Sequence, residues 1–212
     1  MTGTGKYDAA AEGWSEEQYA DSAAYLLHRA ELVVNLGPKL EPGDTVLDLA
    51  CGDAGLAEPL LQAGLRYAGV DLSGPMVEAA LRRVGDRAEI YEGDLNDFTP
   101  PAPVQAATCF RAVYYARDRR AFFRHVASYT EKKLVFDLNP RQYRVAEVRA
   151  DLAAAGLTHV ELHPFFSPQQ VALPGPLAAA LQAAERSGPL ARLALRFRFS
   201  YMVAASPTRQ RG

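Results

Sequence analysis

The sequence has few of the features that mark secreted, metal-binding or membrane-spanning proteins. It contains two cysteines, Cys51 and Cys109, too few for a disulfide framework or a CxxC metal site. Residues 1–12 lack the apolar core of a signal peptide. No stretch approaches the roughly 18 apolar residues of a membrane-spanning helix. We therefore expect a cytoplasmic protein with no bound metal and no membrane partner.

An excess of charge of one sign is also missing. The 23 basic and 25 acidic side chains leave a net charge of −2, so no overall positive field attracts nucleic acid. Arginines do cluster at residues 117–124, but they share a predicted helix with Phe122, Phe123 and Val126, so we expect them on its solvent-exposed face. Phosphate contacts need clustered basic residues, and we expect no nucleic-acid partner. The 212 residues, 49% of them apolar, suffice for one sizeable domain.

Strand-like and helix-like segments alternate along most of the chain. The apolar runs predict strands at 45–49, 67–71, 88–92, 106–110, 133–138, 158–163 and 193–203. Helical periodicity predicts helices at 14–36, 56–63, 75–84, 119–129, 141–155 and 177–186. This alternation indicates an α/β fold, with a mostly parallel sheet and helices on both faces. Such sheets bind ligands outside the carboxyl ends of their strands.

Residues 46–55, with the sequence VLDLACGDAG, are the most informative segment. An apolar strand carrying Asp48 is followed by a turn of small residues and then by a predicted helix. Small residues let a ligand approach the backbone closely, and the start of the helix directs N–H groups at it. A carboxylate such as that of Asp48 is costly to bury unless a cationic amine or backbone amides pair with it.

A second carboxylate ends the next predicted strand. Asp71 lies 19 residues after Gly52 (71 minus 52), a spacing at which a carboxylate can accept hydrogen bonds from ribose hydroxyls. The turn and Asp71 together predict a site for a nucleoside-type cofactor.

These motifs resemble those of class I S-adenosylmethionine-dependent methyltransferases. The resemblance rests on residues 46–55, on GVDLS at 69–73 and on EGDL at 92–95, and it covers about residues 40–140. It implies a Rossmann-like, doubly wound, seven-stranded and mostly parallel sheet whose last strand is antiparallel. It also implies S-adenosyl-L-methionine as methyl donor and S-adenosyl-L-homocysteine as product.

The resemblance further implies which residues contact the cofactor. Asp48 would lie near its amino group, and the turn of Ala50, Cys51 and Gly52 would lie beside its methionine part. Asp71 would hold the ribose hydroxyls. The remaining cofactor contacts would come from Leu72, Met76, Asp94, Leu95 and Phe110. The family usually has glycine where this chain has Ala50 and Ala54, and alanine is the next smallest residue.

Candidate residues for the methyl acceptor lie after the later strands and in the N-terminal segment. They are Tyr7, Trp14, Tyr19, Arg111, Tyr114, Asn139, His163, Phe165 and Phe166. Each has a structural alternative: packing for the aromatic residues and the histidine, ion pairing for the arginine, and a helix-starting turn for the asparagine. No residue is indicated as a general base, and oxygen, nitrogen, carbon and sulfur acceptors all stay open.

The predicted domain organisation has three parts. Residues 1–40 form an N-terminal helical cap, residues 41–206 form the methyltransferase domain, and residues 207–212 form a flexible tail. A helical insertion at about 165–190 is expected to cover the acceptor site with Leu177 and Leu181. A covered pocket predicts a small-molecule substrate, and we expect a monomer or a homodimer.

Two other functions are compatible with parts of this pattern. An NAD(P)-dependent Rossmann oxidoreductase would use a similar turn, Ala50-x-Gly52-x-x-Gly55, with Asp71 on the ribose. Asp48, however, would repel the anionic pyrophosphate of that cofactor. A non-catalytic S-adenosylmethionine-binding module would keep the motifs and show no turnover.

Overall fold

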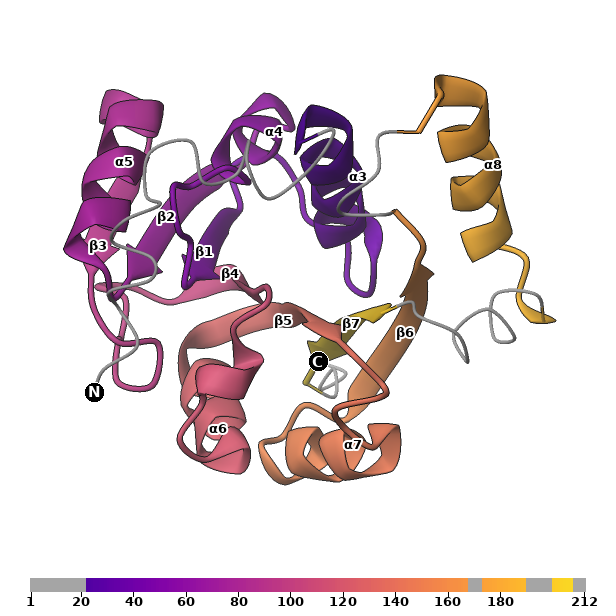
Figure 1. Ribbon diagram of the computed structural model, residues 1–212. Helices are drawn as coiled ribbons and strands as arrows, with labels where there is room; N and C mark the ends of the chain where they lie inside the picture. The colour runs from indigo at the N-terminus through magenta and orange to yellow at the C-terminus, as the bar shows by residue number, and fades with distance from the viewer. Residues whose placement is uncertain (1–21, 168–172, 190–199, 208–212) are drawn as a thin grey trace.

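The computed structural model describes residues 22–167, 173–189 and 200–207. Its centre is a seven-stranded sheet with the strand order β3-β2-β1-β4-β5-β7-β6 (Figure 1). The strands are β1 (Thr45–Leu49), β2 (Arg66–Asp71), β3 (Glu89–Glu92), β4 (Val104–Cys109), β5 (Thr130–Leu138), β6 (His159–Phe165) and β7 (Ser200–Ser206). Strands β1 to β5 are parallel, and β7 runs antiparallel to β5 and β6. The predicted fold, including the antiparallel last strand, is confirmed.

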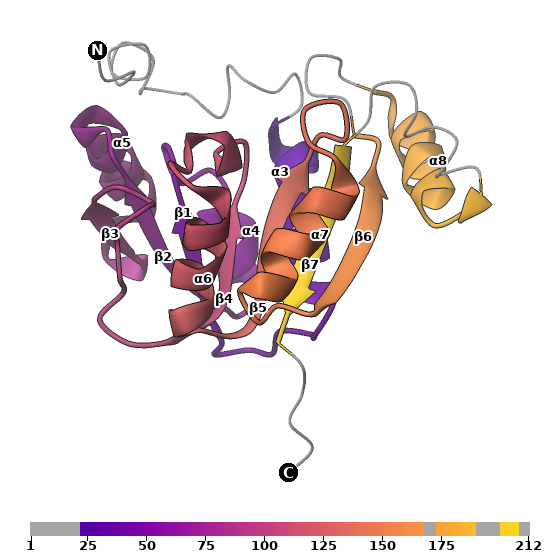
Figure 2. The ribbon, with the colours of Figure 1, turned by 90° about the horizontal axis from the view of Figure 1, so that it is seen from below.

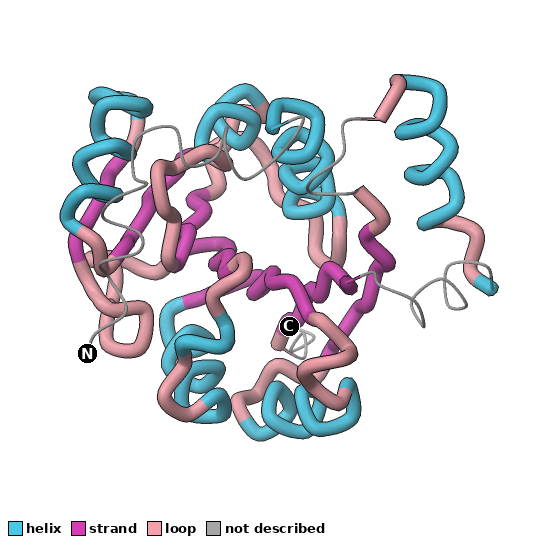
Figure 3. Tube along the Cα trace, in the orientation of Figure 1, coloured by secondary structure: helices cyan, strands magenta, loops and turns pink. Residues whose placement is uncertain are grey.

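Helices cover both faces of the sheet (Figures 1 and 3). One face carries α3 (Ser22–Asn35), α4 (Ala57–Gln62) and α5 (Gly74–Val84). The other carries α6 (Arg119–Tyr129) and α7 (Val145–Ala154), while α8 (Gly175–Glu185) lies beyond the edge strand β6 (Figure 2). Two short 3-10 turns, η1 (Gly85–Arg87) and η2 (Val113–Tyr115), complete the described elements. No helix in these parts of the chain is long and apolar enough to cross a membrane.

Local side-chain chemistry explains where the elements begin. Helix α5 starts after Ser73, whose hydroxyl accepts a hydrogen bond from the Met76 N–H at 3.4 Å, as expected of an N-cap. Helix α7 begins at Val145, later than the predicted 141, because Asn139 first closes a turn. Its side chain accepts from the Arg141 N–H at 3.0 Å, and its carbonyl accepts from the Gln142 N–H at 3.0 Å.

Strand boundaries differ from the prediction by a few residues. Strand β4 begins two residues before the predicted 106, and β5 three residues before the predicted 133, because pairing between them already starts at Val104 and Thr130. Strand β6 extends to Phe165, which pairs with Ser200 of β7. The predicted segments 14–21 and 193–199 lie outside the described residues.

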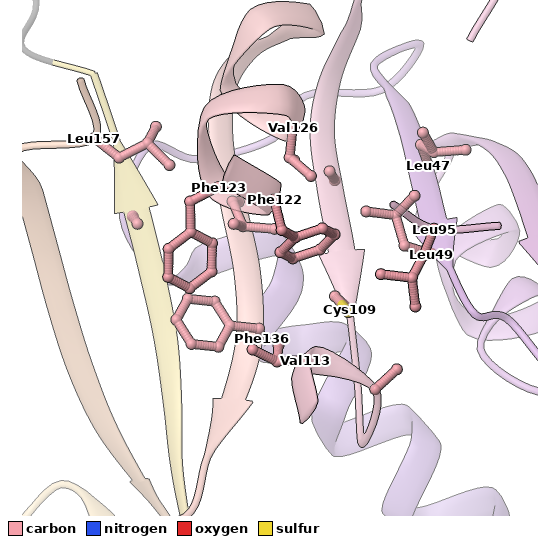
Figure 4. Close-up of a cluster of buried hydrophobic side chains, with 14 of the residues drawn as sticks. Leu47, Leu49, Leu95, Cys109, Val113, Phe122, Phe123, Val126, Phe136 and Leu157 are labelled. Carbon is pink, nitrogen blue, oxygen red and sulfur yellow. The ribbon is translucent and has the colours of Figure 1, made fainter. Parts of the chain in front are cut away.

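Buried apolar side chains fix the helices on the sheet. On one face, Phe122, Phe123 and Val126 of α6 pack toward the strands (Figure 4). The rings of Phe123 and Phe136 have centroids 5.4 Å apart. Burial of each such side chain stabilises the fold by about 1.5–3 kcal/mol. On the other face, Val33 of α3 belongs to a second buried cluster with residues of β1 and α4, so α3 is held against the sheet.

A buried lysine fixes the carboxyl end of α3. The Nζ of Lys133, in β5, donates to the carbonyl oxygens of Val34 at 3.1 Å and Leu36 at 2.7 Å. The last carbonyls of a helix lack intrahelical partners and carry partial negative charge, so a cationic donor there satisfies them. The side chain is fully buried, and this burial lowers the pKa of Lys133 to about 7.

Replacement of Lys133 by methionine should remove a pH dependence of folding. The pKa of the folded state, about 7, lies below the ordinary value of 10.5, so the unfolded state binds more protons between these values. The free energy of unfolding should therefore rise with pH. From pH 7 to pH 9 we expect it to rise by about 2 kcal/mol more in the native protein than in Lys133→Met. Urea unfolding at both pH values measures this difference.

The neighbouring Lys132 provides the matched control. Its side chain is 33% exposed and pairs with Asp44 at 2.6 Å. Lys132→Met should keep the pH dependence of the native protein. An identical rise in stability for the native protein and Lys133→Met would contradict the assignment of the effect to the buried amine.

Candidate functional site

A cavity of about 330 Å³ lies at the carboxyl ends of the parallel strands. It is lined by the segments that follow β1, β2, β3 and β4, together with residues of α3. All ten residues predicted to contact a cofactor line it: Asp48, Ala50, Cys51, Gly52, Asp71, Leu72, Met76, Asp94, Leu95 and Phe110. The topology therefore brings four separate sequence motifs to one site.

The turn after β1 has an alternating left-handed backbone. Ala50, Gly52 and Ala54 have φ values of 58°, 57° and 56°. This region costs a residue with a Cβ about 1–2 kcal/mol, which only glycine avoids. The structure keeps the strained alanines because the turn is anchored on both sides. The Cys51 N–H donates to the Val70 carbonyl at 3.0 Å, and Asp53 pairs with Arg83 at 2.8 Å.

Asp71 joins the turn to the start of α5. One of its carboxylate oxygens accepts from the Gly52 N–H at 2.8 Å, and the other accepts from the Ser73 N–H at 3.0 Å. These two backbone donors orient the carboxylate, which lines the cavity.

Gly69 of β2 lets the turn approach the sheet. A Cβ at this position would lie 2.8 Å from the Sγ of Cys51 and 3.0 Å from Cδ1 of Ile90. The Cys51 thiol occupies that space, and burial raises its pKa well above the ordinary value, as expected of a structural and not a nucleophilic cysteine. No cluster of three or more potential metal ligands occurs among the residues of the three described ranges.

Asp48 is a buried carboxylate at the base of the cavity. It is 5% exposed, and it accepts hydrogen bonds from the hydroxyls of Thr108 at 2.6 Å and Tyr67 at 2.9 Å. Burial raises the pKa of Asp48 to about 6, although these hydrogen bonds and the charge of Arg29 oppose the rise. At neutral pH the protein therefore holds an ionised carboxylate in a poorly solvated place.

Arg29 of α3 supplies a cation to the same cavity, and sequence analysis did not identify it. It is 4% exposed and donates to the Tyr25 hydroxyl at 2.7 Å. Its guanidinium carbon lies 4.3 Å from the centroid of the Phe110 ring. A lone arginine within a helical pattern carries no sequence signal for a site, and only the packing of α3 on the sheet brings it into the cavity.

The far end of the cavity combines an apolar surface with a carboxylate. Leu72 and Met76 line it, and Asp94 accepts from the Asn96 backbone N–H at 2.8 Å and from its side-chain amide at 2.7 Å. Arg117 also donates to Asp94. Burial alone would raise the pKa of Asp94, but the hydrogen bonds from Asn96 and Arg117 lower it below its ordinary value. Asn96 and Arg117, which line the cavity too, were not predicted.

Two of the predicted acceptor residues, Arg111 and Tyr114, line the cavity. Tyr114 stands beside Tyr115, with ring centroids 4.3 Å apart, and both rings are about half exposed. Asn139 does not line the cavity, because its side chain is used in the turn before α7. The predictions for Tyr7, Trp14 and Tyr19 fall outside the described residues.

His163, Phe165 and Phe166 do not line the cavity, which corrects the prediction. Phe165 stacks on the imidazole of His28, with centroids 5.3 Å apart and an interplanar angle of 10°. His163 lies 3.4 Å from the carboxylate of Glu185. Phe166 packs against Leu181 of α8. These side chains connect β6 with α3 and α8.

The predicted cover formed by α8 is also wrong. Nothing in the described part of α8 lines the cavity, and its Leu177 is 49% exposed. The buried carboxylate of Glu185 accepts from His28 Nε2 at 2.8 Å and from the Phe166 N–H at 2.6 Å. Charged hydrogen bonds of this kind are strong in a buried place, and they hold α8 at the β6 edge.

Comparison with known proteins gives three further findings. Residues 46–133 match the family model of a methyltransferase domain. An uncharacterized methyltransferase of Geobacillus thermodenitrificans is 31% identical over 113 residues, which are 53% of this chain and 50% of that protein. The dTDP-4-amino-2,3,4,6-tetradeoxy-D-glucose N,N-dimethyltransferase of Saccharopolyspora spinosa is 33% identical over 105 residues, 46% of this chain and 42% of that one. The chain thus spans about half the length of the curated relatives it matches.

The fold has a close counterpart among solved structures. Magnesium protoporphyrin IX methyltransferase from Synechocystis PCC 6803, crystallised with bound S-adenosylmethionine, superposes with a TM-score of 0.60. The two chains are 20% identical, and the match covers 89% of this chain and 83% of that one. At this identity the likeness establishes the fold.

Asp48→Asn should stabilise the protein at neutral pH. Between the ordinary pKa of 3.8 and the folded-state value of about 6, the folded state binds more protons, so Asp48 lowers stability as pH rises through this window. Asparagine keeps a hydrogen-bonding group for Thr108 and Tyr67. We expect the free energy of unfolding of Asp48→Asn to exceed that of the native protein by about 2–3 kcal/mol at pH 7.5, and by much less at pH 4.

Guanidinium chloride unfolding at the two pH values measures this gain. Asp86→Asn, at an exposed position after α5, is the control and should change little. A loss of stability in Asp48→Asn at pH 7.5 would show that the ionised carboxylate is well compensated in the protein alone.

Gly69→Ala should destabilise the turn after β1. The added methyl group meets Cys51 and Ile90 at distances that require both to move, and overpacking of this kind costs about 1–3 kcal/mol. Gly74→Ala is the matched control, because its Cβ would meet only Oε2 of Glu92 at 3.8 Å. Thermal unfolding compares the two variants. Equal melting temperatures would mean that the turn has room to shift.

Proposed function

We propose that this chain is a class I S-adenosylmethionine-dependent methyltransferase and that it transfers a methyl group from S-adenosylmethionine to a small molecule. The observation that carries the proposal is the pairing of charges in one cavity. Asp48 and Arg29 supply a carboxylate and a guanidinium, and Asp71 and Asp94 supply hydrogen-bond acceptors farther along it.

The methionine part of the cofactor fits the end of the cavity with Asp48 and Arg29. It carries an ammonium and a carboxylate, which are the complements of these two side chains. When no ligand is bound, the ionised form of Asp48 lowers the stability of the fold, since burial raises its pKa to about 6. A cationic amine beside it offsets that cost, so the site is electrostatically prepared for an amino acid.

The nucleoside part fits the remaining acceptors. The carboxylate of Asp71 is held by two backbone N–H groups at the cavity, and a carboxylate at this place accepts hydrogen bonds from ribose hydroxyls. Leu72 and Met76 offer an apolar surface for the adenine ring. Asp94, whose pKa is lowered by Asn96 and Arg117, remains an acceptor for an exocyclic amino group.

Bound S-adenosylmethionine supplies an electrophilic methyl carbon. The acceptor atom would form a bond to that carbon while the carbon–sulfur bond breaks. The electron pair of the broken bond would stay on sulfur, which becomes the neutral thioether of S-adenosylhomocysteine. The protein mainly places the two reactants in line. Phe110, Arg111 and Tyr114 follow β4 and border the part of the cavity available to the acceptor.

Two observations support a small-molecule acceptor. The net charge of −2 disfavours nucleic acid. The relative from Saccharopolyspora spinosa acts on a nucleotide-linked amino sugar, according to its name. The proposed residue roles rest on this geometry. The domain division at residue 40 and the N-terminal cap also remain proposals.

Asp48 argues against a nicotinamide dinucleotide in the same cavity. The pyrophosphate of such a cofactor would lie against the turn that follows β1. Asp48 is buried beside this turn, and an ionised carboxylate in a poorly solvated place repels an anion strongly. The buried Asp48 carboxylate is therefore the feature that separates the two cofactor classes.

Calorimetric titration with S-adenosylhomocysteine tests the proposal. The native protein should bind it and should not bind NADH. Asp71→Ala should weaken binding about ten- to a hundredfold, because it removes a charged hydrogen-bond acceptor worth about 1.5–3 kcal/mol. Asp48→Asn should weaken binding of S-adenosylhomocysteine although it stabilises the fold. Arg29→Met should also weaken binding, because it removes the cation that pairs with the carboxylate of the ligand.

Two exposed residues outside the cavity serve as controls. Asp86→Asn and Arg82→Met change the same kinds of charge without touching the cavity, and both should bind normally. Tight binding of NADH without binding of S-adenosylhomocysteine would reject the proposal. Cofactor binding with no methyl transfer to any acceptor would favour a non-catalytic module.

A further inference from the structure

We propose that Tyr67 and Thr108 are positioning residues for the methyl donor, and that their hydroxyls orient the Asp48 carboxylate toward the ammonium group of the cofactor. This role rests on the proposed function, to which it adds the two residues that prepare Asp48 for a cation. Asp48 lines the cavity, whereas Tyr67 and Thr108 are not among its lining residues. The two hydroxyls therefore act through the carboxylate and do not touch the ligand.

The three side chains meet across the centre of the sheet. Strand β1, which carries Asp48, lies between β2 and β4 (Figure 1). The parallel register places Asp48 opposite Thr108 of β4 and opposite Gly69 of β2. Tyr67 lies two residues before Gly69, so its side chain is on the same face of β2, and its hydroxyl reaches along the strand to Asp48. The sheet thus brings both hydroxyls to one carboxylate.

Polar side chains are unusual at such positions. Buried side chains of central parallel strands are normally apolar, because helices cover both faces of the sheet. Asp48, Tyr67 and Thr108 are nevertheless 5%, 3% and 0% exposed. Thr108 donates to one carboxylate oxygen at 2.6 Å, and Tyr67 donates to the other at 2.9 Å. With one donor on each oxygen, the carboxylate is fixed in its orientation at the base of the cavity.

Both donors are neutral, so they orient the carboxylate without cancelling its charge. Burial and the charge of Asp48 raise the pKa of Tyr67 well above its ordinary value, so the phenol keeps its proton. The Thr108 hydroxyl is likewise an uncharged donor. A lysine or arginine in their place would pair with the carboxylate and leave less charge for a ligand. The two hydroxyls therefore suit a carboxylate whose cation arrives with the ligand.

Charged and titratable groups from other elements also act on Asp48. Arg29 of α3 lowers the pKa of Asp48, and Asp71 at the end of β2 raises it. The thiols of Cys51 and Cys109 stay protonated, because burial raises the pKa of each well above its ordinary value. These four groups are the same in the native protein and in the variants described below. A difference in pH profile between them therefore reports the removed hydroxyl.

The affinity for S-adenosylhomocysteine, measured by calorimetry between pH 5.5 and pH 8, tests this role. The pKa of Asp48 is about 6, and protonation removes the charge that attracts the ammonium, so binding should weaken as pH falls through that value. Each hydroxyl stabilises the charged form, and its loss should raise this pKa. In Tyr67→Phe and Thr108→Val the midpoint should lie about one pH unit higher, and affinity at pH 6.5 should fall about threefold or more.

A conservative variant and a shortened ligand separate positioning from general loss of structure. Thr108→Ser keeps the hydroxyl and should keep the native pH profile. 5′-Methylthioadenosine shares the nucleoside of S-adenosylhomocysteine and lacks its amino-acid part. Its affinity, measured by ligand-observed NMR, should be the same in the native protein, Tyr67→Phe and Thr108→Val, which also shows that each variant still forms the cavity.

Two hydroxyls outside the cavity provide matched controls. The buried hydroxyl of Thr130 donates to the Val126 carbonyl at 2.8 Å, and the hydroxyl of Tyr91 donates to Glu89. Thr130→Val and Tyr91→Phe make the same chemical changes as the test variants. Both should keep the native affinity and the native pH profile.

The outcomes distinguish this role from the proposed function. Failure of the native protein to bind S-adenosylhomocysteine would reject the proposed function itself. With that ligand bound, a native affinity that is equal at pH 8 and pH 5.5, or a native midpoint in both Tyr67→Phe and Thr108→Val, would overturn the positioning role. An equal loss of affinity for both ligands in these variants would overturn it too. A shift in one variant alone would remove the other residue from the proposal.

Discussion

The hydrogen bonds that Asp71 accepts hold together the three segments on which the cavity depends. Its carboxylate takes the N–H of Gly52 from the turn after β1 and the N–H of Ser73 at the start of α5. The parallel register of β1 and β2 places Leu49 opposite Val70, so both strands end at the same level and the two turns meet. Loss of this carboxylate would free a turn whose backbone is already strained at Ala50 and Ala54.

The cavity is built from groups that are unfavourable in the protein alone. Asp48 is ionised in a buried place, the turn after β1 holds alanines in the left-handed region, and Arg111 is held there too. Each of these costs stability, and Asp48, Ala50 and Arg111 line the cavity. The packed core of the sheet, including Phe123 against Phe136, stabilises the fold and offsets the cost of these features.

The edge of the sheet opposite β3 has a different organisation. Glu185 of α8 is buried and takes hydrogen bonds from His28 of α3 and from the backbone of Phe166. Phe165 lies between these elements, stacked on His28 and facing Tyr25. Since Arg29 follows His28 in α3, the same contacts fix the helix that carries a cation into the cavity. Helix α8 therefore contacts the helix that carries Arg29 and does not line the cavity.

The sequence, together with the family resemblance of its motifs, determined the sheet, the turn after β1 and the ten predicted cofactor residues that line the cavity. Strand and helix periods are local, and parallel strands bring whatever follows them to one edge, so Asp48, Asp71 and Asp94 could be placed together without coordinates. Arg29, Arg117 and the buried Glu185 could not be placed in this way. Their roles depend on which face of a helix or loop packs inward and on partners up to 157 residues away, as for His28 and Glu185. Only the tertiary structure decided these contacts, because a long-range hydrogen bond or ion pair leaves no periodic trace in the chain.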